Sequence, residues 1–125
     1  MEYIAKSEEL IRQSIPGKFY LLDAVVTRFD IYQQEHRLYI DVYFSLPYHR
    51  FEAEKTLKLY FIDVIEYSFY WNASHSFYNV GRCKFFKSEK GYYISLDPVD
   101  ESEELSDEDQ DVILCKEVEG CFYDC

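Results

Sequence analysis

The sequence predicts a mainly β fold (α+β), with a curled antiparallel sheet or sandwich of about six strands and a short N-terminal helix. Aromatic residues make up 19% of the 125 residues, with 13 tyrosines and 10 phenylalanines, and such residues are enriched in strands. Apolar residues alternate with polar ones from Phe19 to Leu46 and from Thr56 to Ile94, the period that a strand requires. In places both alternating faces are apolar, which favours a curled sheet or a sandwich over a flat sheet.

The N-terminal helix is predicted for residues 5–17, AKSEELIRQSIPG. Ser7 is suited to cap its start, and Pro16-Gly17 ends it. Its apolar residues fall near one face at helical spacing: Ile4, Leu10, Ile11 and Ile15. A helix this short is marginal in isolation, so we expect it to pack on the body of the domain.

Two strand-like runs follow, from Lys18 to Gln33 and from Arg37 to Leu46. The polar break Gln33-Gln34-Glu35-His36 separates them, and this arrangement predicts an antiparallel hairpin. In the first run, alternation places one set of residues on the same side: Phe19, Leu21, Val25, Phe29 and Ile31. In the second run the corresponding set is Leu38, Ile40, Val42 and Phe44.

Three further strands are predicted within residues 56–71, 77–86 and 92–98, with a tight turn at Ser-Glu-Lys-Gly before the last of these. Pro98 ends the ladder because proline lacks a backbone donor. The final run, DVILCKEVEGCFYDC, fits a helical stripe, with Ser106 and Asp109 as a capping box, as well as one face of a strand. Gly120 costs a helix about 1 kcal/mol, and the sheet needs partners, so we favour a strand.

The charge of the chain is concentrated in one place. Residues 97–111, DPVDESEELSDEDQD, hold nine acidic side chains and no Lys or Arg, whereas the formal net charge of the whole chain is -11. We therefore expect a single domain, residues 1–125, that carries an exposed acidic loop between its last two strands. Such a charge argues against binding a nucleic-acid backbone or an anionic membrane.

No metal or cofactor is predicted. Asp107, Asp109 and Asp111 resemble the start of a calcium loop, but Val112 and Val118 occupy the positions that need Gly and a bidentate Glu. Of the closely spaced cysteines only Cys121 and Cys125 fall within the zinc-site spacing, and in a strand Cys115 and Cys121 lie about 20 Å apart, too far to share one ion. All four are therefore expected to be reduced thiols: Cys83, Cys115, Cys121 and Cys125. The N-terminus shows no signal peptide and no apolar run could span a membrane, so we expect a cytoplasmic protein. The three histidines fall in predicted loops and no catalytic motif is present, so an enzyme is not expected.

Two hydrophobic patterns give the chain a resemblance to a known group. Leu22-Asp23-Ala24-Val25-Val26 matches an "hxDAxV" opening strand, and residues 57–64, LKLYFIDV, match an "LxLxFxxV" central strand. In this order they resemble a broad group of small bacterial proteins, some of which are immunity proteins of polymorphic toxin systems. The resemblance covers roughly residues 18–120 and implies binding to a toxin domain.

These observations predict a non-catalytic domain that binds another protein, a basic toxin domain being one such partner. The acidic loop would steer the encounter, and exposed aromatic residues would hold the complex. The candidate contact residues are Asp100, Glu101, Glu103, Glu104, Asp107, Glu108, Tyr67, Tyr70, Trp71 and Tyr78. The alternative function is a small-ligand binding module with a Tyr- and Phe-lined pocket inside the curled sheet.

Overall fold

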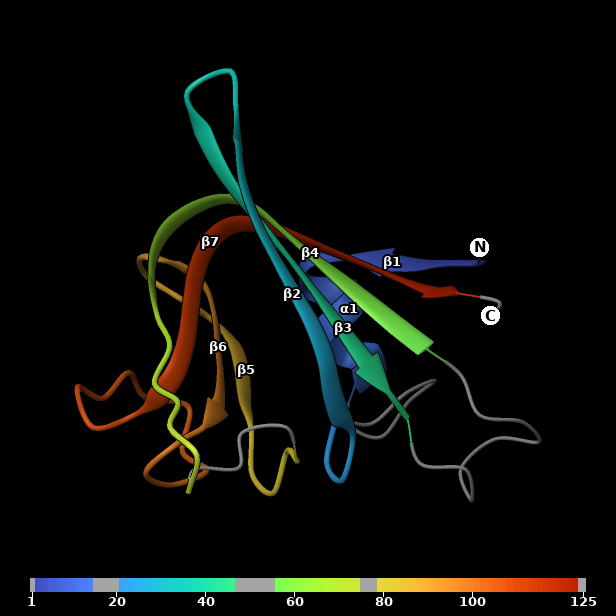
Figure 1. Ribbon diagram of the computed structural model, residues 1–125. Coiled ribbons are helices and arrows are strands. Elements are labelled where there is room, and N and C mark those ends of the chain that lie inside the picture. The colour runs from blue at the N-terminus through green and yellow to red at the C-terminus, as the bar shows by residue number, and fades with distance from the viewer. Residues whose placement is uncertain (1, 15–20, 47–55, 75–78, 124–125) are drawn as a thin grey trace.

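The fold is one open antiparallel sheet of seven strands with a short helix near the N-terminus (Figure 1). This computed structural model describes residues 2–14, 21–46, 56–74 and 79–123. The strand order is β2-β3-β4-β7-β6-β5, and β1 pairs with β7 beside that path. The elements in chain order are β1 (Glu2–Lys6), α1 (Ser7–Ser14), β2 (Val25–Gln34), β3 (Arg37–Ser45), β4 (Thr56–Ser68), β5 (Lys84–Ser88), β6 (Gly91–Asp97) and β7 (Gln110–Tyr123).

The prediction of a mainly β fold is confirmed, and the curled single sheet is the arrangement observed among the described residues. The ambiguous C-terminal run is strand β7, which joins the two parts of the sheet. On one side it pairs with β4, from Thr56↔Tyr123 to Ser68↔Val112. On its other side β6 pairs with the first half of β7 and β1 with the second half.

The two central strands bend where their pairing is interrupted. β4 shifts register between Val64 and Glu66, and Asp63 just before this point has a φ of 57°. Aspartate tolerates this left-handed conformation better than most residues, and an extra residue in one strand bends and twists it. Figure 1 shows β4 and β7 curving together at their middle, so that the sheet wraps around its inner face.

The main core fills the inner face of this curl. Fully buried residues of β3, β4 and β7, among them Phe44, Leu59 and Val118, pack there in one cluster with Leu10 of α1. The helix contacts β7, β1 and β5. It lies so close to β7 that a Cβ atom on Gly120 would come within 2.7 Å of Leu10 Cδ1. A glycine at this position therefore makes room for the helix.

The structure corrects several predicted boundaries and adds a strand. Residues 2–6 form β1, so Ile4 is buried in a strand rather than on the helix. The fifth strand begins at Lys84, seven residues later than predicted. The hairpin between β2 and β3 is confirmed, but its turn is only Glu35-His36, both with positive φ (50° and 66°). Such two-residue turns match the twist of the paired strands.

The predicted inner face of the first strand is wrong in part. Val25 and Ile31 are 38% and 43% exposed, whereas Val26 is buried. β2 begins only at Val25 and shifts register between Val26 and Arg28, which moves the side chains to the other face. Ile31 pairs with Ile40, which in turn pairs with Phe61 one position before the pairing of β3 with β4 ends at Tyr39↔Ile62. Phe19 lies outside the described residues.

Candidate functional site: an acidic segment folded over a pocket

The acidic segment, residues 97–111, connects β6 to β7 on the outer side of the sheet. Beneath it is a second, smaller apolar cluster of Phe86, Tyr93 and Leu114, on the face opposite to the main core. The predicted exposed connection is confirmed for the six acidic candidates, which are all solvent-exposed: Asp100, Glu101, Glu103, Glu104, Asp107 and Glu108. Asp109 and Asp111 are buried instead, at 8% and 1% exposure.

A buried lysine from β5 organises the segment. The Lys84 side chain is 1% exposed, and its Nζ donates to the backbone oxygen of Glu104 at 2.7 Å and to Asp109 Oδ2 at 2.9 Å. It also forms an ion pair with Asp100 Oδ1 at 3.2 Å. One ammonium group therefore joins the beginning, middle and end of the segment. Lys84 was not among the residues predicted for the site, although a lysine beside Phe85 and Phe86 is a signal for a buried cation.

Asp109 is the counterpart of Lys84. Its carboxylate accepts hydrogen bonds from the Tyr93 hydroxyl at 2.6 Å and from the Val99 backbone N–H at 2.9 Å, in addition to the Lys84 ammonium. Burial alone would raise the pKa of Asp109, but these three donors outweigh it and hold the pKa below its ordinary value. The same contact, together with burial, raises the pKa of Tyr93. Ser106 and Asp109, which would form a capping box if the last run were a helix, instead form a turn in which the Asp109 N–H donates to the Ser106 oxygen at 3.2 Å.

Asp100 is fixed although it is exposed. Its Oδ1 accepts from the Ser102 hydroxyl at 2.7 Å and from the Ser102 backbone N–H at 3.0 Å. These bonds, followed by the Lys84 ammonium, lower the pKa of Asp100 to about 2. Asp100 and Asp109, the two carboxylates that contact Lys84, are therefore both ionised over the whole neutral range.

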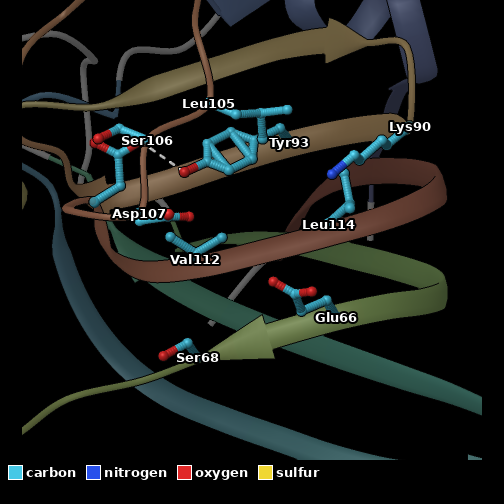
Figure 2. A pocket seen from close by; sticks show the side chains of 10 residues that line it. Glu66, Ser68, Lys90, Tyr93, Leu105, Ser106, Asp107, Val112 and Leu114 are labelled. Carbon is cyan, nitrogen blue, oxygen red and sulfur yellow. Dashed lines mark hydrogen bonds between the residues drawn. The ribbon is translucent and has the colours of Figure 1, made fainter.

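A pocket of about 290 Å³ opens between the acidic segment and the sheet (Figure 2). Its apolar lining comes from Tyr93, Leu105, Val112 and Leu114. Its polar lining comes from three different parts of the chain: Glu66 and Ser68 of β4, Lys90 of the turn between β5 and β6, and Ser106, Asp107 and Asp109 of the acidic segment. A second hollow of about 380 Å³ shares Leu105 and Lys90 with it and is also lined by Phe86.

Among the described aromatic candidates, Tyr67 lies in β4, and Tyr70 and Trp71 follow the end of this strand. Tyr67, Tyr70 and Trp71 are 43%, 51% and 50% exposed. Tyr67 packs against Phe69, with ring centroids 5.4 Å apart, and Phe69 borders the main core. Because side chains alternate along a strand, Tyr67 faces away from the pocket that Glu66 and Ser68 line.

Tyr70 contacts the acidic segment directly. Its backbone N–H donates to Asp111 Oδ1 at 3.0 Å, and this contact places the end of β4 beside the start of β7. Tyr78 lies outside the described residues.

A second buried ion pair lies on the outer face of the other half of the sheet. Lys58 Nζ is 3.5 Å from Asp41 Oδ2 and lies over the rings of Tyr60 and Tyr43, at 4.0 and 5.1 Å from their centroids. The Tyr32 hydroxyl donates to Asp41 Oδ1 at 3.2 Å. Burial raises the pKa of Asp41 despite the nearby ammonium. The longer contacts, compared with those of Asp109, explain why this carboxylate is the less stabilised of the two.

The described cysteines are unpaired and sheltered. Cys115 and Cys121 are buried, Cys83 is half-buried, and burial raises the pKa of Cys115 to about 12. Such a thiol is protonated at neutral pH and is a poor nucleophile. Among the described residues, no group of three or more His, Cys, Asp and Glu side chains is placed to hold a metal. Cys125 lies outside the described residues.

Within the described ranges, no helix has the length and apolar character needed to cross a membrane. No protein-family model, curated protein or solved structure matches the chain.

Proposed function

We propose that the chain is a non-catalytic protein-binding domain whose acidic segment recognises a basic partner protein. The observation that carries this proposal is the anchoring of the segment by Lys84. One buried ammonium binds Asp100, the Glu104 backbone and Asp109, while five other acidic residues of the segment are exposed to solvent: Glu101, Glu103, Glu104, Asp107 and Glu108. The segment therefore presents a dense negative charge in a fixed shape.

A fixed acidic surface has two consequences for binding. It attracts a basic partner from a distance and raises the association rate, an effect that salt screens. Because the segment is already ordered, it also loses little conformational entropy when the complex forms. A toxin domain that acts on nucleic acids fits this description, since such a domain needs a basic surface, and the resemblance to immunity proteins supports the same class of partner. The exposed aromatic residues Tyr70 and Trp71, close to the end of the segment, are suited to pack against it.

The proposal is tested by removing charge without disturbing the anchor. The charge-loss variant replaces Glu101, Glu103 and Glu108 by Gln; the structure assigns none of these side chains a hydrogen bond or ion pair within the described residues. The matched control replaces three exposed glutamates elsewhere by Gln: Glu2, Glu35 and Glu117. Both variants lose the same formal charge, so a difference between them reports the position of the charge.

Binding partners are captured from extracts of the source organism on the immobilised wild type and on both variants. We expect basic proteins on the wild type and the control, and few on the charge-loss variant. The association rate of a captured partner should fall for the charge-loss variant at low salt. This difference should vanish near about 1 M salt, where the Debye length is about 3 Å. Equal capture and equal rates for all three proteins would refute the proposal.

A further inference from the structure

The pocket beneath the acidic segment has the chemistry of a receptor for one particular kind of side chain. We propose that it takes a single long cationic side chain, Lys or Arg, from the basic partner protein. This inference rests on the proposed function and names the contact that would give it specificity. The acidic surface attracts many basic proteins, whereas a shaped pocket selects a partner that places a cation at one point.

The lining matches the two parts of such a side chain. Leu105, Val112 and Leu114 offer apolar surface for the methylene stem, and Glu66 and Asp107 offer carboxylates for the charged head. Lys and Arg side chains bury their stems against apolar surface while the charged group remains near water. The volume of about 290 Å³ is large enough for one such side chain.

The two carboxylates are available for a ligand. Figure 2 shows Glu66 on β4 and Asp107 on the acidic segment on either side of Val112. Within the described residues, neither carboxylate has an ion pair or a side-chain hydrogen bond. Asp109, which also lines the pocket, is already satisfied by Lys84, Tyr93 and Val99. Glu66 and Asp107 come from segments some 40 residues apart, so the folded sheet is what brings them to one pocket.

The charge of Lys90 affects the binding of cationic and anionic ligands in opposite directions, so a change at this residue tests the charge of the ligand. It is the one cationic residue among those lining the pocket, and Figure 2 shows its side chain above Leu114. Its ammonium group repels a cationic ligand and attracts an anionic one. Removing this charge should therefore strengthen the binding of a cationic side chain.

The second hollow indicates a protein segment rather than a free amine as the source of the cation. It adjoins the pocket through Leu105 and Lys90, and Leu105 is 42% exposed between them. A partner segment that inserts one side chain into the pocket would cover Leu105 and reach the second hollow with a neighbouring residue. A small free amine would leave this apolar surface exposed.

The test uses two blocked pentapeptides, acetyl-Gly-Ala-Arg-Ala-Gly-amide and its citrulline counterpart, which has nearly the same shape without the charge. Each is titrated into the isotope-labelled full chain and followed by nuclear magnetic resonance. We expect the arginine peptide to shift the amide signals of Glu66, Ser68, Lys90 and Leu114, and the citrulline peptide to have little effect. Equal effects of the two peptides at these signals would overturn the inference.

Two variants then assign the contact. Glu66→Gln should weaken binding of the arginine peptide by about two- to five-fold, and Lys90→Gln should strengthen it by a similar factor, as expected for a partly exposed charge interaction. The matched controls Glu35→Gln and Lys6→Gln, which remove the same charges far from the pocket, should change it little. Weaker binding of the arginine peptide to Lys90→Gln would contradict a cationic ligand.

Two further probes distinguish failure of this inference from failure of the proposed function. Agmatine, a free guanidinium amine, should bind no more tightly than the peptide; agmatine binding about ten-fold tighter would replace the protein segment by a small amine as the ligand. A blocked octalysine peptide tests the acidic surface alone. If the charge-loss variant weakens octalysine binding but the arginine peptide does not reach the pocket, this inference fails and the proposed function stands. If neither the arginine peptide nor octalysine binds, this inference and the proposed function both fail.

Discussion

At the scale of single residues, Asp109 shows how one buried carboxylate fixes a whole segment. Its side chain is fully buried and is paired with Lys84, which is 1% exposed. Asp109→Asn would remove the negative charge and leave Asp100, which is exposed, as the ion-pair partner of the Lys84 ammonium group within the described residues. Removing one member of a buried ion pair costs about 3–5 kcal/mol, and we expect a loss of about 3 kcal/mol in the free energy of unfolding, measured by urea denaturation.

The exposed neighbour Asp107 supplies the control for this measurement. Asp107→Asn changes the same chemical group two residues away and should alter the unfolding free energy by less than about 0.5 kcal/mol. If Asp109→Asn cost as little as Asp107→Asn, the segment would not depend on the buried pair.

Acid should loosen the segment in a defined range of pH. The folded-state pKa values of Asp100 and Asp109 lie below their ordinary values, that of Asp100 at about 2. A carboxylate with a lowered folded-state pKa stabilises the fold fully above its unfolded-state pKa, about 3.9, and loses this contribution as the pH falls through the folded-state value. We therefore expect the urea midpoint to fall between about pH 4 and about pH 2, and to fall less steeply in Asp100→Asn.

Asp41 has the opposite effect on how stability changes with pH. Burial raises its folded-state pKa, so its ionised form costs stability at neutral pH and this cost disappears as the carboxyl group is protonated. Asp41→Asn removes that compensating gain and should make the acid-induced loss steeper than in the wild type. An acid profile unaltered by both Asp41→Asn and Asp100→Asn would contradict these assignments.

At the scale of elements, the position of α1 depends on the absence of a side chain in β7. A Cβ atom on Gly120 would approach Leu10 Cδ1 to 2.7 Å and Leu59 Cδ2 to 3.2 Å, and both leucines are fully buried. Overpacking of this kind costs about 1–3 kcal/mol. We expect Gly120→Ala to lower the unfolding free energy by that amount in thermal or urea denaturation. Gly81→Ala, where nothing lies within 4 Å of the added Cβ, should be nearly neutral.

Local patterns in the sequence predicted the elements that depend on local chemistry. The alternation of Ile40, Val42 and Phe44 identified the inner face of β3, because the extra residue at the β2–β3 register shift lies in β2 and β3 itself keeps its alternation. The exposure of Val25 and Ile31 was not predictable in this way. The exposure of Val25 results from the register shift between Val26 and Arg28, which tertiary pairing sets rather than the local sequence.

In the candidate site, too, the features that depend on local sequence were predicted and those that depend on tertiary pairing were not. The exposure of the six acidic candidates follows from their charge and was predicted, whereas the burial of Asp109 and Asp111 and the network that shapes the segment were not. Lys84 lies 25 residues before Asp109 in the sequence, and only the pairing of β5 with β6 and of β6 with β7 brings the two together. The charges of Glu66 and Lys90 become part of one pocket for the same reason.

At the scale of the whole molecule, β7 makes the two parts of the sheet depend on each other. Its first half supports β6 and the acidic segment, and its second half supports β1 and α1, while β4 runs beside it through both. The main core likewise includes Leu10 of α1 and Ile94 of β6. A binding surface on one side is thus held in place by packing on the other.

This coupling predicts a single cooperative unfolding transition. Trp71, the one tryptophan of the chain, follows the end of β4 near the acidic segment, so its fluorescence reports that half, whereas far-ultraviolet circular dichroism reports all strands. We expect both signals to give the same urea midpoint, as for a small two-state domain. Asp109→Asn in one half and Gly120→Ala in the other should each lower both midpoints together. A fluorescence transition that shifts in Asp109→Asn while the dichroism transition stays in place would instead mean that the acidic half unfolds on its own, and that β7 does not transmit stability across its bend.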